Sequence, residues 1–458
     1  MSPYVSQLAR AAWYQCSGPL GRPVAYSWPV PVLPAAVTVA GYRAFARAQR
    51  FDIRPITLLF GDNNAGKSAL LRVLPLVADS VAPTASGPLD LDSPATRSST
   101  FAELHCKAPG SARELVMTFH WDDDEIASAM FALDWWDDWK RLVVRRFEIA
   151  NGKGQTVLQA TWIPRREDRK QALIRYALEL AGKSHEVDLG FPGLWPAYTD
   201  RRDGSGHATS DAVPGEAVHY LAMVAGRQQM LASRVQWLTA TRAVPPRISN
   251  LPPGPIQRMR PDGRDAIAVL AFDPELRTEI SRWYERHLRR ELRILEVPPG
   301  SFRITLGGLD VDLIDTGEGM IQVLPVLTAL ALASRPRQGG SGIVAIEEPE
   351  SHLHPNLQRA LAEHLCHMVT AHPAMRVVLE THSEHVLLAI QLAIARGQIA
   401  PEHVLVYWVQ QFDNGQSIAN PVTFDRDGRP RENWPPGVFS EDDDLARELL
   451  RTRRENKA

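Results

Sequence analysis

Residues 53–72 read Ile-Arg-Pro-Ile-Thr-Leu-Leu-Phe-Gly-Asp-Asn-Asn-Ala-Gly-Lys-Ser-Ala-Leu-Leu-Arg, and the rest of the chain is organised around them. The apolar run from Ile56 to Phe60 favours a short strand, and the apolar positions after Ser68 favour a helix. Between them lies a loop of the form G-x-x-x-x-G-K-[ST]. This order of strand, loop and helix is the context that identifies a phosphate-binding loop, or P-loop.

Each position of this loop has a physical purpose. Gly61 and Gly66 let the backbone curl so that several N–H groups point at one phosphate chain, and the helix start adds its positive end. Lys67 is expected to reach the β- and γ-phosphates, and Ser68 to offer its hydroxyl to Mg²⁺. The alternative, a glycine turn that happens to contain Lys-Ser, is disfavoured because both flanks and spacing fit. We therefore predict that ATP and Mg²⁺ bind here, with contacts from Gly61, Asp62, Asn63, Asn64, Ala65, Gly66, Lys67, Ser68 and Ala69.

Composition excludes several classes of protein. The 458 residues suggest two to three domains, and 44% hydrophobic with 23% charged residues is ordinary for a globular protein. A net charge of −2 gives no global attraction to nucleic acid or membrane, although a local basic face stays possible. Cys16, Cys106 and Cys366 lack C-x-x-C spacing, which favours reduced thiols in a cytoplasmic protein without a zinc site. No apolar run approaches the ~20 residues that span a bilayer, so no membrane partner is expected.

The region after the P-loop helix indicates an antiparallel sheet. Short strands are expected at 37–45 and 51–60, and residues 114–121 alternate apolar and polar as a half-buried strand does. Strands at 142–150 and 155–163 flank Asn151-Gly152, a strong hairpin signal. The tryptophans of segment 134–139 are interpreted as packing in a local helix or loop. An aromatic platform for nucleic acid is the alternative, disfavoured by the acidic neighbours.

The middle of the chain is predicted to be mainly helical. Segments 168–181, 216–233 and 274–295 have helical spacing, and Asp273-Pro274 provides a cap and a first helical residue for the third. A short strand is expected at 235–239. One face of the third helix carries Arg282, Arg286, Arg289 and Arg290. A solvated helix face is the preferred interpretation, with a DNA-facing surface as the alternative.

The C-terminal third alternates strands and helices. Strands are expected at 302–306, 309–314, 342–347 and 376–379, and a hairpin at 403–411 and 417–424. Helices are expected at 323–333, from Pro355 onward, and at 384–396. This alternation predicts an α/β fold with a parallel sheet.

Acidic residues and a histidine follow two of these strands. Glu347, at the end of the apolar run 342–347, is predicted to hold Mg²⁺ through water, although aspartate is usual there. Glu348 is predicted to orient or deprotonate the attacking water. His382 closes the next strand, where its imidazole would reach the γ-phosphate; a helix-cap histidine is the alternative. His352 and His354 are interpreted as loop residues rather than metal ligands.

At these residues the chain resembles a known family. The P-loop, Glu347-Glu-Pro-Glu-Ser-His-Leu-His-Pro355 and Glu380-Thr-His-Ser-Glu-His385 are similar to ABC-type ATPases of the overcoming-lysogenization-defect and RecF-like group. Two further stretches, Trp237-Leu-Thr-Ala-Thr-Arg242 and Trp434-Pro-Pro-Gly-Val-Phe439, resemble the subgroup with a C-terminal domain of unknown function called DUF3696. Pro261-Asp-Gly-Arg also matches. The resemblance spans residues ~36 to 450 and is loose between 100 and 230.

The resemblance implies an ABC-type P-loop ATPase head that dimerises with ATP between subunits. Thr316-Gly-Glu-Gly319 would be the signature motif, meeting the other subunit's γ-phosphate through Thr316, Gly317, Glu318 and Gly319. Thr316 is our choice for the residue that replaces the usual serine. The predicted division is an extension (1–35), an N-terminal ATPase lobe with an antiparallel β subdomain (36–165), an inserted helical subdomain (166–300), a C-terminal ATPase lobe (301–425) and a tail (426–458).

Three functions are compatible with this resemblance. The first is an ATPase, with Lys67, Glu348 and His382 as catalytic residues, that dimerises on ATP and gates a separate effector such as a nuclease or toxin in anti-phage defence. The second is a RecF-like ATP-dependent DNA-binding protein in repair, and the third is a nucleotide-bound scaffold with negligible turnover. Near-neutral charge favours the first over the second. Many relatives carry a Toprim nuclease domain, but Asp442-Asp-Asp444 has no strand before it and is interpreted as a helix N-terminus.

Overall fold

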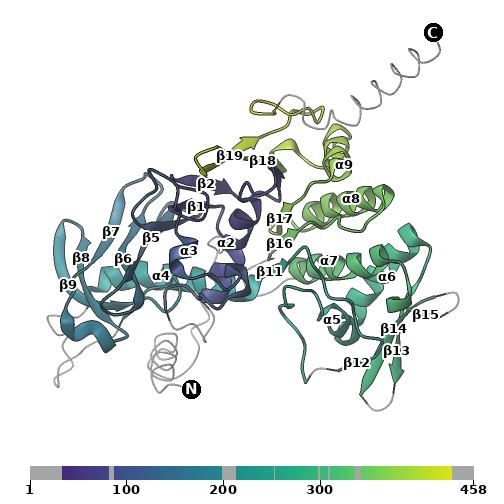
Figure 1. The fold of residues 1–458 in the computed structure, drawn as a ribbon, viewed down its shortest axis with the longest axis horizontal. Helices are drawn as coiled ribbons and strands as arrows, with labels where there is room; N and C mark the ends of the chain where they lie inside the picture. Colours follow the sequence, from purple (N-terminus) through teal and green to yellow (C-terminus); the bar gives the residue numbers. More distant parts are fainter. Residues whose placement is uncertain are drawn as a thin grey trace, which may run out of the picture.

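The computed structural model describes residues 33–81, 87–198, 213–251, 253–297, 300–307, 310–335 and 342–435. These residues form three sheets with helices between and around them (Figure 1). The predictions for most of the N-terminal extension, for the end of the Trp434–Phe439 match and for Asp442–Asp444 lie outside the described residues.

The central sheet carries the P-loop. Its strand order is β11-β16-β17-β3-β18-β19, and all neighbouring pairs are parallel except β18 with β19. The strands are β3 (Ile56–Gly61), β11 (Val235–Leu238), β16 (Ile343–Glu347), β17 (Arg376–Glu380), β18 (Val404–Gln411) and β19 (Ser417–Val422). Parallel strands are covered on both faces, which explains their continuous apolar runs. Because β3, β16 and β17 run the same way, the P-loop and both acidic strand ends meet at one edge of the sheet.

Two hydrophobic cores lie on opposite faces of this sheet, and β3 contributes to both. Leu59 packs into the first core, whereas Ile56, Leu58 and Phe60 pack into the second, as the two-residue period of a strand requires. The first core holds α2 (Lys67–Ser80) and the second holds α7 (Glu318–Ser334), α8 (Pro355–Ala371) and α9 (Glu384–Ala395). The P-loop helix is thereby fixed between the central sheet and a second sheet.

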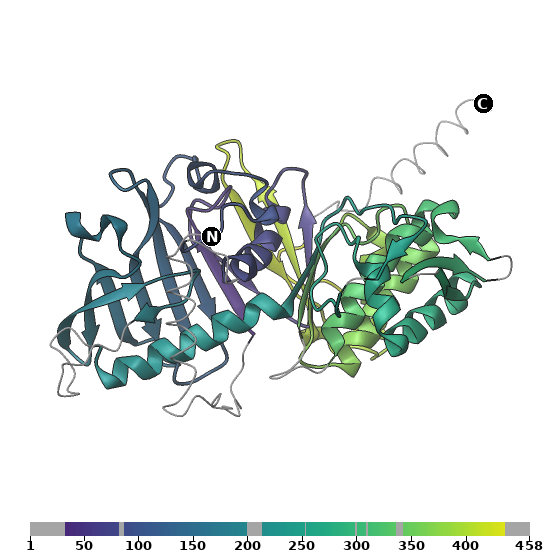
Figure 2. The ribbon, with the colours of Figure 1, turned by 90° about the horizontal axis from the view of Figure 1, so that it is seen from below.

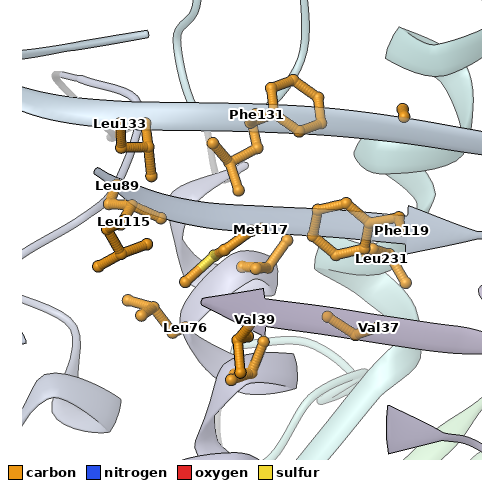
Figure 3. Close-up of a cluster of buried hydrophobic side chains, with 14 of the residues drawn as sticks. Val37, Val39, Leu76, Leu89, Leu115, Met117, Phe119, Phe131, Leu133 and Leu231 are labelled. Atoms are coloured by element: carbon orange, nitrogen blue, oxygen red, sulfur yellow. The ribbon is translucent and has the colours of Figure 1, made fainter. Parts of the chain in front are cut away.

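That second sheet is antiparallel, which confirms the predicted meander. Its order is β10-β9-β8-β7-β6-β5-β4-β1-β2. The strands are β1 (Ala36–Ala40), β2 (Gln49–Asp52), β4 (Leu115–His120), β5 (Ser128–Trp136), β6 (Arg141–Ala150), β7 (Thr156–Trp162), β8 (Ile174–Leu180), β9 (Lys183–Gly190) and β10 (Ala197–Tyr198). The long helix α4 (Gly215–Arg234) runs along it toward β11 (Figure 2). Figure 3 shows side chains of β1, β4 and β5 meeting Leu76 of α2 and Leu231 of α4.

A small third sheet lies beyond α7. β14 (Ser301–Leu306) pairs with β12 (Ser249–Asn250), β13 (Leu292–Val297) and β15 (Val311–Asp312). It packs with α5 (Ala266–Phe272) and α6 (Pro274–Leu288) in the second core. The remaining helical segments are the short α3 (Phe101–Leu104) and 3-10 turns at Pro94–Thr96, Arg166–Lys170, Leu313–Asp315 and Pro401–His403. No helix among the described residues is long and apolar enough to cross a membrane.

The predicted helix at 168–181 is wrong. A 3-10 turn at Arg166–Lys170 is followed by β8, whose side chains alternate between buried and less buried. Ala181 and Gly182 both have positive φ, 49° and 75°, and make the tight turn into β9. The spacing of the leucines and alanines in this segment fits both the 3.6-residue period of a helix and the two-residue period of a strand. The segment forms a strand because it pairs with β7 on one side and with β9 on the other. Residues 174–198 therefore continue the antiparallel sheet, and the mainly helical insertion predicted from residue 166 first becomes helical at α4.

Other boundaries also differ from the predictions. The strand expected at 309–314 is reduced to Val311–Asp312 and is followed by the 3-10 turn at Leu313–Asp315. The helix expected to reach residue 295 ends at Leu288, because Arg289 turns left-handed (φ 54°) and β13 then pairs with β14. Helix α7 begins at Glu318, five residues before the predicted start at 323. The tryptophan segment packs locally as preferred, with Trp136 and Trp139 edge-on against Trp162, but residues 134–136 belong to β5 rather than to a helix or loop.

Candidate nucleotide-binding site

The geometry of the loop requires both predicted glycines. Gly61 has φ 134°, and a Cβ there would lie 1.9 Å from the carbonyl oxygen of Val409 on β18. Gly66 has φ 100° and caps the N-terminus of α2. Neither backbone conformation suits a residue with a side chain, so the strand-to-helix turn depends on these two positions.

Lys67 is folded back over the loop. Its side chain is buried, and Nζ donates hydrogen bonds to the carbonyl oxygens of Gly61 (2.8 Å) and Asp62 (2.7 Å). Burial lowers the pKa of Lys67, while nearby Glu380, Asp62 and Glu348 act in the opposite direction. An entering phosphate would offer this ammonium a charged acceptor in place of two neutral carbonyls, which is a stronger hydrogen bond.

A cavity of about 610 Å³ opens over the start of α2. That volume falls in the range of small-molecule sites. Of the predicted contacts, Asn64 to Ala69 line it, and Gly61, Asp62 and Asn63 do not. The lining also includes cations that the sequence did not single out, namely Arg43, Arg97 and Lys107, together with residues of the β18–β19 turn. A pocket with a lysine, a helix N-terminus and basic walls suits a polyanion.

Glu347 does not face this cavity. Its carboxylate accepts two hydrogen bonds from the guanidinium of Arg72, at 2.6 and 2.5 Å, and a third from Nε1 of Trp237 at 3.2 Å. Both partners of the ion pair are buried, with side-chain exposures of 7% for Arg72 and 4% for Glu347. The metal role predicted for Glu347 would require this pair to open. Leaving either charge buried alone typically costs ~3–5 kcal/mol.

Glu380 occupies the position that was expected of Glu347. Its Oε1 accepts a hydrogen bond from the hydroxyl of Ser68 (2.8 Å), and it lines the cavity beside Lys67. Sequence reasoning missed this residue, although a signal was present. Both 343–347 and 376–380 are apolar runs that end in glutamate, and their parallel register places Glu380 directly beside Glu347.

Glu348 follows the strand in a strained turn. Its φ is 45°, a left-handed conformation that costs of order 1 kcal/mol or more for a residue with a side chain. The turn is fixed from three directions: its N–H donates to Glu380 O (2.8 Å), its carbonyl accepts from Arg242 (3.0 Å), and its Oε2 accepts from Ser351 (2.8 Å). A strained residue that its surroundings hold in place is typical of functional sites.

His382 lies at the carboxyl end of β17, as predicted, and its side chain is exposed. Its backbone N–H donates to the buried carboxylate of Glu350 (2.8 Å), a contact that the sequence analysis did not foresee. Partial desolvation of the imidazole against the protein surface and the charge of Lys67 lower the pKa of His382, while Glu348 acts in the opposite direction. The imidazole therefore shares one electrostatic environment with the P-loop lysine and the strand-end acid, and it favours the neutral form near pH 7.

The glycine-rich stretch 316–319 does not reach the P-loop cavity of its own chain. Thr316 donates its hydroxyl to Leu313 O, and Gly317 caps the N-terminus of α7. None of the four residues lines the cavity. Gln322 of α7 accepts a hydrogen bond from Arg242 (3.2 Å), whose guanidinium also donates to the carbonyl oxygens of Glu347 and Glu348 at the end of β16. The start of α7 is thereby tied to the turn that holds Glu348.

His352 and His354 lie in the loop between β16 and α8. His352 has φ 66°, and Nδ1 of His354 accepts from the N–H of Asn356 at 3.4 Å as a cap of α8. Their interpretation as loop residues agrees with these positions.

A protein-family model matches part of the chain. The model described as "AAA domain, putative AbiEii toxin, Type IV TA system" matches residues 205–389. This stretch holds β11, α7, β16, Glu348 and His382, whereas the P-loop lies outside it. The chain therefore contains a match to an AAA-type ATPase domain and, outside the matched residues, a P-loop that its own sequence and geometry identify. No curated protein matches the chain.

Solved structures with a similar arrangement are heads of SMC proteins. The SMC head domain from Thermotoga maritima is 11% identical, with a TM-score of 0.41, and the alignment covers 85% of this chain and 99% of that one. An SMC head bound to the C-winged helix domain of ScpA gives 10% identity and a TM-score of 0.44, covering 86% and 98%. The Smc head domain bound to the C-terminal domain of ScpA derived from Pyrococcus furiosus gives 10% and 0.40, covering 85% and 96%. Similarity at this level carries no argument about function.

Replacing Lys67 with alanine should weaken ATP binding strongly. The phosphates lose their buried cation, and a hydrogen bond to a charged group contributes about 1.5–3 kcal/mol, so affinity should fall by at least ~10-fold. Calorimetric titration with ATP measures this. Lys153→Ala, in the exposed turn after β6, is the control and should bind like the wild type. Wild-type affinity in Lys67→Ala would refute the P-loop assignment.

Proposed function

We propose that the protein is an ATPase that binds ATP with Mg²⁺ at the P-loop, dimerises on ATP and regulates a separate effector protein. The observation that carries the proposal is the cavity of about 610 Å³, which Lys67, Ser68 and several basic residues line at one edge of the central sheet. Glu348 and His382 follow the neighbouring parallel strands β16 and β17 at the same edge, although they do not line the cavity itself. ATP is a substrate whose charge and size suit that cavity. Bound Mg²⁺ would neutralise phosphate charge as it does in P-loop enzymes generally.

The residues at this edge of the central sheet would have different roles in hydrolysis. Lys67 and the N-terminus of α2 stabilise the phosphate charge. Glu348, turned out of the strand by its left-handed backbone, takes the proton of the attacking water. His382, neutral near pH 7, donates a hydrogen bond toward the γ-phosphate without adding a charge. Ser351 and Arg242 keep Glu348 in this orientation through their hydrogen bonds to it.

The proposed dimer joins the P-loop of one copy to segment 316–319 of the other. Gly317 and Glu318 are exposed at the start of α7, where unpaired backbone donors and the helix end favour an anion. The segment lines no part of its own chain's P-loop cavity. The phosphate that it suits would therefore belong to a second copy.

A separate effector is supported by the matched family and by the resemblance in sequence. The description of the matched family includes the words "putative AbiEii toxin, Type IV TA system", and we take the toxin class as one kind of effector. The resemblance to the overcoming-lysogenization-defect group supports anti-phage defence as the biological role. ATP binding would then change the arrangement of the two heads and so the activity of the effector.

One observation favours DNA binding as a second candidate function. Arg282, Arg286, Arg289 and Arg290 at the end of α6 form no ion pair with other residues of the described chain, so their charge is available to phosphates. If DNA binds there, affinity should fall steeply with salt, by ~10-fold or more between 50 and 200 mM for several phosphate contacts. Removing Arg289 and Arg290 should flatten that slope. No binding to duplex DNA at 50 mM salt would exclude this candidate and leave the effector-gating function.

A large side chain at Gly317 should block ATP-dependent dimerisation. No atom lies within 4 Å of a Cβ built at Gly317, so Gly317→Gln should leave the monomer intact and obstruct only a second copy. Gly319 is unsuitable, because a Cβ there would lie 2.8 Å from the carbonyl of His352. Sedimentation with and without ATP measures the mass, and Gly254→Gln, also in open space, is the control. An unchanged ATP-dependent increase in mass in Gly317→Gln would remove segment 316–319 from the interface.

Replacing Glu348 with glutamine should separate hydrolysis from binding. The amide oxygen can still accept from Ser351, so the turn is kept, but an amide cannot take the proton of water. Phosphate release should fall by ~10²–10⁴-fold while ATP remains bound, and the trapped state should be the dimer. His382→Ala should be milder, because it removes a phosphate contact and not the base. Normal turnover in Glu348→Gln would show that another group is the base.

A further inference from the structure

Two glutamates end neighbouring parallel strands at the same level. Glu347 of β16 and Glu380 of β17 are register partners, and both are buried. Buried carboxylates side by side are unfavourable unless each has a compensating cation. The surroundings of the two residues differ in this respect.

Glu347 has its cation within the chain. The bidentate pair with Arg72 and the bond from Trp237 leave its carboxylate enclosed, and it does not line the P-loop cavity. The guanidinium of Arg72 also lies 5.7 Å from the Trp237 ring centroid, within the range of a cation–π contact. This carboxylate is satisfied without any ligand.

Glu380 has no such partner. Oε1 accepts from Ser68, whereas Oε2 is buried and makes no hydrogen bond with the described residues. Burial raises the pKa of Glu380, and the neighbouring Glu347 raises it further, against the opposing effects of Ser68, Lys67 and Arg72. Unlike Glu347, this carboxylate lines the cavity. It is an incompletely satisfied acid beside the hydroxyl that a P-loop offers to a metal ion.

We propose that Glu380, together with Ser68, binds the Mg²⁺ that accompanies ATP, and that Glu347 is a structural acid locked by Arg72. The inference rests on the proposed ATPase function. Ser68 and Arg72 are one helical turn apart on α2 and so lie on the same face, each directed at one of the two glutamates. Two residues of the same helix therefore give the two acids different partners, a hydroxyl for Glu380 and a guanidinium for Glu347.

Few protein ligands are enough for this metal. Mg²⁺ is usually held by one or two carboxylates with substrate phosphates and water. No group of three or more His, Cys, Asp or Glu side chains suited to a metal occurs in the described part of the chain. The remaining ligands would come from the nucleotide and solvent, which makes metal binding and ATP binding depend on each other.

The test measures how Mg²⁺ strengthens binding of a fluorescent ATP analogue, without hydrolysis as the readout. The variant Glu380→Gln keeps the shape of the side chain and an oxygen that can accept from Ser68. The Mg²⁺ concentration that gives half of the maximal enhancement should nevertheless rise by at least ~10-fold. Even residues that only support metal ligands typically change metal affinity by that factor when they are replaced. Binding in EDTA should be retained. The double variant Arg72→Met, Glu347→Leu replaces the buried pair with apolar groups, a change that folded proteins often tolerate. It should keep the wild-type Mg²⁺ dependence.

The outcomes separate this inference from the proposed function. An unchanged Mg²⁺ dependence in Glu380→Gln, or its loss in the double variant, would overturn the assignment. If the double variant does not fold, Glu347→Gln replaces it, because its amide oxygen can still accept a hydrogen bond from Arg72. Normal Mg²⁺ dependence in Glu347→Gln would support the assignment, and a ~10-fold shift would overturn it. Absence of nucleotide binding by the wild type would overturn the ATPase proposal and this inference together.

Discussion

The buried ion pair of Arg72 and Glu347 is the interaction that gives the two strand-end acids different surroundings. It joins α2, which starts in the P-loop, to the end of β16, 275 residues later in the chain. Such a pair adds little net stability over an apolar pair of the same size, but it is costly to break from one side. Its effect is to occupy the carboxylate of Glu347, which lines no part of the cavity. The packing of α2 in the first core keeps Ser68 against Glu380.

The parallel strands of the central sheet bring motifs that are far apart in the sequence close together in space. β17 lies between β16 and β3, so the turn with Glu348, the residue His382 and the P-loop emerge at the same edge. The antiparallel sheet and α4 cover α2 from the other side, and their core fixes the helix that carries Lys67. Arg242 and Gln322 connect this edge to the start of α7. Under the proposed function, this connection would transmit a change at segment 316–319 to the turn that holds Glu348.

Sequence reasoning succeeded where the signal is local. The P-loop, the strand before it, the hairpin at Asn151 and the strand-end position of His382 each follow from a few adjacent residues. It failed for β8, because the apolar residues between 173 and 180 fit a helical and a strand period equally well, and the Ala181-Gly182 turn was overlooked. The roles of Glu347 and Glu380 could not be separated from sequence alone, since the difference arises from an arginine that only the fold brings to one of them.

The most direct measurement is an experimental structure of the protein with Mn²⁺ and a non-hydrolysable ATP analogue, with the metal located by its anomalous scattering. The account predicts one metal peak beside Ser68 and Glu380, the phosphates over the N-terminus of α2, and the Arg72–Glu347 pair still closed. A metal peak at Glu347 with Arg72 displaced would contradict the division of roles between the two acids. Nucleotide bound away from the P-loop would contradict the account as a whole.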